Sequence, residues 1–124
     1  MGWMEQTEAV LSALSQQTGV PYDYRTMETD PKTNQLPDEY MVYFEVDDPG
    51  VSWADGKETA HEARLQVSYY FRSKPRRLVI PPLIEAAFMA AGFTRVGSAS
   101  GDMPFQTDTG HNGWRCDFRK YERR

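Results

Sequence analysis

The clearest pattern in the chain is an alternation of apolar and polar residues from Thr59 to Arg72. One face carries a mainly apolar series: His61, Ala63, Leu65, Val67, Tyr69 and Phe71. The other face carries a mainly polar one: Glu62, Arg64, Gln66, Ser68, Tyr70 and Arg72. Because successive side chains of a strand point to opposite faces, the pattern predicts a long strand in a sheet with one covered and one more polar face.

A second alternating segment, Glu39–Asp47, predicts a neighbouring strand. Its two faces carry Tyr40, Val42, Phe44 and Val46 on one side, and Met41, Tyr43 and Glu45 on the other. The connection Asp48–Gly56 (DPGVSWADG) is rich in turn residues and predicts a long hairpin loop. Trp53 stands out within this polar loop, either folded back onto the sheet or exposed as an anchor for a partner.

Two segments have the spacing of amphipathic helices. The first covers residues 3–18, carries Trp3, Val10, Leu11 and Leu14, and stops at Gly19 and Pro21. The second carries Leu83, Ile84, Ala87, Phe88 and Ala91 and stops at Gly92. Pro81 and Pro82 suit a first turn, so the regular helix is predicted to begin near them; alternatively, Leu78–Ile80 add an irregular first turn.

The remaining segments predict shorter elements. Pro21–Arg25 and Phe93–Ser98 are typical of short strands, and residues 114–119 alternate as a last strand. Glu28–Asp38 is predicted to be a loop and Gly101–Gly110 a turn-rich connection. We therefore expect a single α+β domain over residues 1–124. Its sheet has four to five strands, antiparallel or alternatively mixed, with both helices packed on one face.

The net charge of −4 hides an asymmetry between the two halves of the chain. Residues 1–62 carry 13 acidic and 3 basic side chains, a sum of −10, whereas residues 63–124 carry 5 and 11, a sum of +6. Opposite charges on opposite faces favour head-to-tail contacts between copies. The overall acidity argues against nucleic acid as the main partner, although Arg72, Lys74, Arg76 and Arg77 follow aromatic residues closely enough to raise it as an alternative.

Simple features of the sequence indicate where the protein is made and in which redox environment. No apolar run approaches the ~20 residues of a membrane helix. We expect no signal peptide, because Met1–Ser15 lacks a basic start and carries Glu5 and Glu8. The single cysteine, Cys116, forms no disulfide within one chain, which fits a protein made in a reducing cytoplasm.

Few residues of the chain fall in patterns typical of catalytic or metal-binding sites. His61 and His111 are fifty residues apart and, even with Cys116, provide too few ligands for a zinc site. The favoured interpretation is that His61 lies on one face of a strand and that Cys116 is a small buried apolar group. GSASG at 97–101 fails as a nucleophile elbow because Ala99 occupies the serine position. Asp47, Asp48 and Asp55 lack calcium-loop spacing. We expect no catalytic, cofactor-binding or metal residues, and therefore no enzyme.

Several phrases of the chain resemble a known family. They are DEYMVYFEVDD (38–48), WADGKET (53–59), HEARLQVSYYFRS (61–73), AAGF (90–93) and DTGHNGWRCDFRKY (108–121). With the order of elements, these phrases resemble the tail terminator, or tail-completion, proteins of long-tailed bacteriophages over roughly residues 5–121. The pair Pro81–Pro82 departs from the charged helix start that is usual in this family.

The resemblance implies a structural virion protein rather than an enzyme. Such a protein forms a ring, typically a homohexamer, that caps the tail tube, stops its growth and joins the tail to the head connector. Its partners are copies of itself, the tail-tube protein and the head–tail connector proteins, with DNA only passing through the ring. It is made in the bacterial cytoplasm and located in the neck of the virion. It needs no cofactor and no membrane.

The family has no catalytic residues to carry over, so candidate interface residues rest on chemistry alone. They are Asp47, Asp48 and Trp53 before the long strand, and Arg72, Lys74, Arg76 and Arg77 after it. Three alternatives stay open: a connector or stopper on the head side, a small-ligand-binding or enzymatic α+β domain, and a nucleic-acid-binding domain.

Overall fold

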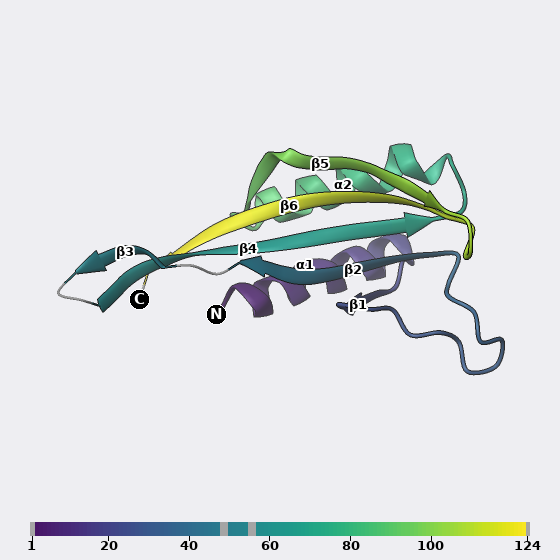
Figure 1. Cartoon of the computed structure of the whole chain (residues 1–124), viewed down its shortest axis with the longest axis horizontal. Coiled ribbons are helices and arrows are strands. Elements are labelled where there is room, and N and C mark those ends of the chain that lie inside the picture. The colour runs from purple at the N-terminus through teal and green to yellow at the C-terminus, as the bar shows by residue number, and fades with distance from the viewer. Residues whose placement is uncertain (1, 48–49, 55–56, 124) are drawn as a thin grey trace.

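A computed structural model describes residues 2–47, 50–54 and 57–123, without the side chains of residues 47, 50–54, 57–62, 98–99 and 121–123. Its two helices are α1 (Trp3–Thr18) and α2 (Arg76–Ala90). Its strands are β1 (Tyr22–Tyr24), β2 (Glu39–Asp47), β3 (Gly50–Ala54), β4 (Lys57–Phe71), β5 (Thr94–Gln106) and β6 (His111–Arg123) (Figure 1). No described helix is long and apolar enough to cross a membrane.

The strands form one six-stranded mixed sheet in the order β1-β2-β4-β6-β5, with β3 paired to β4 outside this path. Tyr22–Tyr24 pairs in parallel with Met41–Tyr43, and every other described pairing is antiparallel. The α+β class is therefore confirmed, whereas four to five strands is too few. The sheet is mixed because the chain leaves α1 and runs in the same direction as β2.

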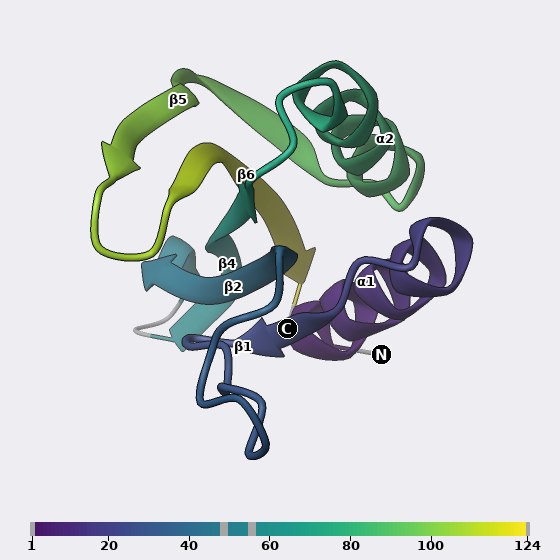
Figure 2. The ribbon, with the colours of Figure 1, turned by 90° about the vertical axis from the view of Figure 1, so that its right-hand side faces the viewer.

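Both helices lie on one face of the curved sheet, as expected (Figure 2). The apolar series of β4 faces them, and Leu65, Val67, Tyr69 and Phe71 belong to the main buried cluster. In β2 the helix-facing set is Met41 and Tyr43, because they pair with Tyr69 and Val67. The helices supply Leu11, Leu14, Ile80, Ile84 and Phe88 to the same core.

The connection after β2 differs from the expected loop. Within the predicted turn segment, Gly50–Ala54 forms β3, which pairs antiparallel with the first part of β4. The turn residues around it concealed a short β-prone run, Val51–Trp53. As a result β4 starts at Lys57 rather than Thr59, and the β3–β4 hairpin extends beyond the body of the molecule (Figure 1).

Helix α2 begins at Arg76, five residues before the first of its two prolines. The expectation that it starts near Pro81 is therefore wrong, and the alternative with an irregular first turn is closer. Arg77 and Leu78 donate their backbone N–H groups to the carbonyl oxygens of Lys74 and Pro75, the i→i−3 spacing of a tight turn. Because this turn starts the helix, Pro81 and Pro82, which have no backbone N–H to donate, follow a helix that has already begun.

The last two strands are longer than predicted. β5 runs on through most of the segment expected to be a turn, and its register with β6 shifts between Val96 and Gly101. Gly101 has a φ of 146°, which glycine adopts readily. Pro104 fits because β5 is an edge strand, where a missing N–H leaves no pair broken. The turn to β6 is thus confined to residues 107–110.

Candidate assembly surfaces

The end of β4 and the start of α2 hold the four basic residues singled out from the sequence. Arg72 follows β4 and makes two sets of contacts. Its Nη1 donates to the Asp38 carboxylate at 2.6 Å, and its Nε and Nη2 donate to the Thr109 carbonyl oxygen at 3.2 and 2.9 Å. Arg72 therefore ties the loop before β2 to the turn between β5 and β6.

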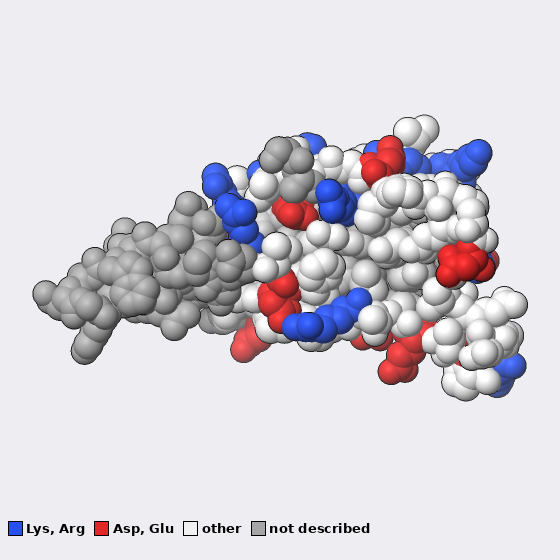
Figure 3. Space-filling view, viewed as in Figure 1, with Lys and Arg blue, Asp and Glu red and all other residues white. Residues whose placement is uncertain are grey.

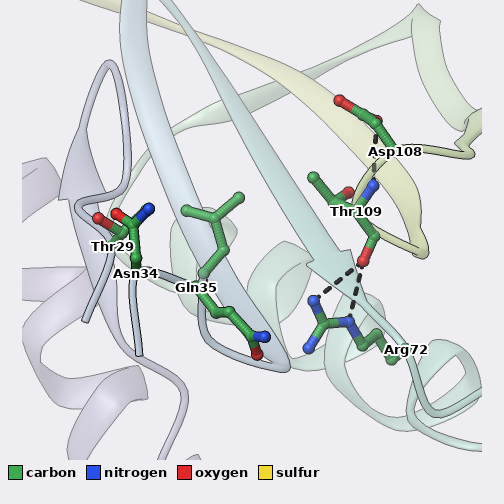
Figure 4. A pocket seen from close by; sticks show the side chains of 7 residues that line it. Thr29, Asn34, Gln35, Arg72, Asp108 and Thr109 are labelled. Carbon is green, nitrogen blue, oxygen red and sulfur yellow. Dashed lines mark hydrogen bonds between the residues drawn. The ribbon is translucent and has the colours of Figure 1, made fainter. Parts of the chain in front are cut away.

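Arg72 also lines a polar pocket of about 460 Å³ between these two segments. Thr29, Asn34 and Gln35 lie on one wall, and Asp108 and Thr109 lie on the other with Arg72 (Figure 4). The lining offers hydroxyl, amide and carboxylate groups for hydrogen bonds. Since the guanidinium already contacts a carboxylate and a carbonyl oxygen, its main effect here is to hold the two walls together.

Arg76 belongs to a hydrogen-bonded network with Glu39 and Tyr69. Its Nη2 and Nε donate to the two carboxylate oxygens of Glu39 at 2.9 and 3.1 Å, and the Tyr69 hydroxyl donates to the same carboxylate at 2.6 Å. Burial, followed by the hydrogen bond to the Glu39 carboxylate, raises the pKa of the Tyr69 hydroxyl well above its ordinary value. This network fastens the start of α2 to the sheet.

Arg77 and Lys74 differ from these two. Arg77 donates from Nε to Asp102 at 2.7 Å and lies over the Trp114 ring, 5.9 Å from its centroid. Lys74 is exposed and makes no ion pair with any described residue. Both line a hollow of about 270 Å³, whose remaining lining is Phe71, Asp102, Met103, Asn112 and Gly113.

Exposed large apolar side chains lie at the end of the molecule that holds the end of β4 and the start of α2. Leu78 is 79% exposed and Val79 49%, both in the first turn of α2, and Phe105 is 55% exposed near the end of β5. The start of α2 and the end of β5 lie at the same end of the long axis (Figure 1). We call Lys74, Arg77, Leu78 and Val79 the α2-start surface.

A second apolar set lies at the other end of the helical layer. Met4 lies in the first turn of α1 and Met89 is close to the end of α2, and both are exposed. Val46, which is exposed as well, is close to the end of β2 in the sheet. Lys120 donates to the Gln6 side-chain oxygen and to the Ala91 carbonyl oxygen, so it draws the start of α1 and the end of α2 together. We call Met4, Glu5 and Met89 the α1-start surface.

The two surfaces are unlike and well separated. Leu78 and Met89 are eleven residues apart on α2, or about 16 Å along the helix axis. The α2-start surface carries positive charge, whereas Glu5 gives the α1-start surface a carboxylate with no ion pair to a described residue. Elsewhere, on the face seen in Figure 3, positive and negative side chains are interspersed.

The other three candidate interface residues cannot be placed as side chains. Asp47 ends β2 and Trp53 lies in β3, where it pairs with Glu58, but only their backbones are among the described parts of the chain. Asp48 lies outside the described residues. Trp53 is thus in a strand rather than in the loop that the turn residues predicted.

Of the three residues considered as metal ligands, His111 and Cys116 do not converge, and the side chain of His61 is outside the described parts of the chain. His111 is fully buried on the helix-free side of β6, stacks edge-on against Tyr40, and donates from Nε2 to the Pro37 carbonyl oxygen at 2.8 Å. Cys116 is fully buried within the helix-covered core beside Ser100, and this burial raises the pKa of its thiol. Among the described residues, no three potential metal ligands come together.

Leu78, Val79, Met4 and Met89 were absent from the candidates drawn from the sequence. A signal was present for the first two, because they are apolar, precede two prolines and fall outside the stripe that starts at Leu83. Met4 and Met89 gave no such signal, since each sits beside residues of a true helical stripe. No protein-family model matches the chain, and no curated protein is significantly similar to it.

Proposed function

We propose that this chain is a structural protein of a bacteriophage tail that assembles into a ring, caps the tail tube, ends its growth and joins it to the head connector. The observation that carries the proposal is the pair of unlike surfaces at the α1 start and the α2 start. Contact between unlike surfaces of neighbouring copies generates a ring when the rotation closes.

The architecture supports a role in assembly. The helix-covered core buries its apolar side chains, and Arg72, Arg76 and Arg77 each have an acidic partner within the chain. The apolar side chains at the two ends remain exposed, as do those of protein–protein contact sites. Two helices packed on one face of a sheet also fit the resemblance to tail terminator proteins.

Native mass spectrometry tests the assembly directly. The expected result is a defined multiple of the 14.3 kDa chain, either alone or after addition of a phage tail-tube protein. A chain that stays monomeric under both conditions and never enters virions would contradict the proposal.

Imaging of labelled virions separates the two sides of the neck. Label between the tail tube and the connector supports the terminator role. Label within the head connector would assign the chain to a stopper instead.

A further inference from the structure

The α2-start surface offers binding groups that its own chain leaves unused. Lys74 is exposed without an ion pair, and Arg77 contacts Asp102 through Nε alone, so its two terminal nitrogens bond to no described residue. The hollow beside them is about 270 Å³, large enough for one or two side chains, and Phe71 and Met103 give it an apolar lining.

The chemistry of this surface selects its ligand. Two cationic side chains favour a carboxylate, and they do so more strongly where a partner displaces water. Leu78 and Val79 are exposed in the first turn of α2, directly after Arg77, and favour an apolar side chain next to that carboxylate. The surface therefore fits a segment in which an exposed apolar residue and an unpaired acidic residue are neighbours.

This chain itself contains such a segment. Met4 and Glu5 are adjacent in the first turn of α1, and both are exposed. Among the described side chains, the other exposed large apolar residues adjoin no unpaired carboxylate. Val46 follows Glu45, which is bound by Arg25 and Tyr24, and precedes Asp47, whose side chain is outside the described parts of the chain. Glu28, a comparable exposed acid, adjoins only the half-buried Met27.

We propose that the α2-start surface of one copy binds the α1-start surface of a second copy. Glu5 of the second copy lies between Lys74 and the terminal nitrogens of Arg77, and Met4 packs on Leu78 and Val79. Asp102 stays on the Nε side of Arg77 and fixes its orientation. This inference rests on the proposed function, and it names the contact by which copies join.

A charge exchange tests the ion pair. Lys74→Glu and Glu5→Lys should each weaken association of the purified chain by about tenfold or more, and the double variant should recover most of that loss. Lys32→Glu and Glu28→Lys are matched controls, since both positions are exposed and belong to neither surface. Glu5→Gln removes the charge without placing a cation at a helix start, where it would weaken folding.

Disulfide trapping tests the geometry even where association is weak. In a Cys116→Ser background, a copy with Met4→Cys is mixed at high concentration with a copy carrying Leu78→Cys. The expected product is the mixed dimer, in excess over both like pairs and over a Glu28→Cys control. Equal yields, or a ring that persists unchanged in Lys74→Glu, would overturn this contact while leaving ring assembly intact. Absence of any oligomer, with or without the tail-tube protein, would instead contradict the proposed function.

Discussion

The inner face of α2 and the two ends of the same helix both carry large apolar side chains, but those on the inner face are buried and those at the ends are exposed. On the inner face, Ile80, Ile84 and Phe88 are at most 1% exposed, and Phe88 stacks on Phe118 at 4.7 Å between ring centroids. At the ends, Leu78 and Met89 keep more than half of their surface in solvent. Apolar content alone therefore does not distinguish the part of a helix that folds the chain from the part that is left for a partner.

The difference separates stability from assembly. The inner face is needed to close the core, so substitutions there should unfold the chain. The end residues contribute little to the core, so substitutions there should leave folding intact and change association. Polar groups follow the same division. Arg76 is held by Glu39, which also accepts a hydrogen bond from Tyr69, whereas Lys74 has no ion pair among the described residues.

Phe88→Ala gives the largest expected effect. The substitution removes a fully buried ring that packs on Phe93 and Phe118, and it leaves a cavity, so it should lower the free energy of unfolding by about 3–5 kcal/mol. Met89→Ala, one residue further, should change it by less than about 0.5 kcal/mol. Urea unfolding followed by circular dichroism measures both. Equal losses at the two positions would break the comparison.

Glu39→Ala tests whether polar contacts at the start of α2 contribute to stability. It leaves Arg76 and the Tyr69 hydroxyl without their shared carboxylate, and we expect a loss of about 2–3 kcal/mol because hydrogen bonds to a charged group are involved. Asp38→Ala removes the neighbouring carboxylate, which is 87% exposed and pairs with Arg72, and should lose less than about 1 kcal/mol. A similar loss in both variants would mean that the partly buried network around Glu39 contributes no more than a surface ion pair.

The pattern of residues predicted the elements whose periodicity is long. α1 was predicted over its observed range, Trp3–Thr18, and the apolar face of β4 was assigned correctly. β3 and most of β5 were missed, because glycine and proline at strand edges and bulges give the same signal as turns. The basic residues were named as candidates from the sequence, but their partners Asp38, Glu39 and Asp102 depend on pairing between distant segments, which no local pattern encodes.

The stability of the fold at alkaline pH tests two buried tyrosines, Tyr43 and Tyr69. Burial first, then hydrogen bonds to Glu8 and Glu39, raises the pKa of Tyr43 and of Tyr69 above the ordinary value of about 10. The unfolded chain therefore releases these protons first, and stability falls as pH rises above about 10, by up to about 1.4 kcal/mol per pH unit for each tyrosine. Unfolding measured between pH 8 and 11 should show this fall. Tyr69→Phe should make the fall less steep, because only the contribution of Tyr43 remains of the two, and an unchanged slope would contradict the assignment.

Leu78→Ser has the smallest expected effect on folding and tests the other half of the comparison. Its side chain is 79% exposed, so the free energy of unfolding should change by less than about 0.5 kcal/mol. Association should nevertheless weaken by about tenfold or more, because a leucine buried at a contact contributes about 1.5–3 kcal/mol. Ala86→Ser, at an exposed position in the middle of α2, is the matched control and should change neither quantity. Sedimentation equilibrium of the three chains gives the association constants. If Leu78→Ser associates as the unaltered chain does, the exposed residues at the start of α2 are not part of the contact, and the division between folding and assembly residues fails at that end.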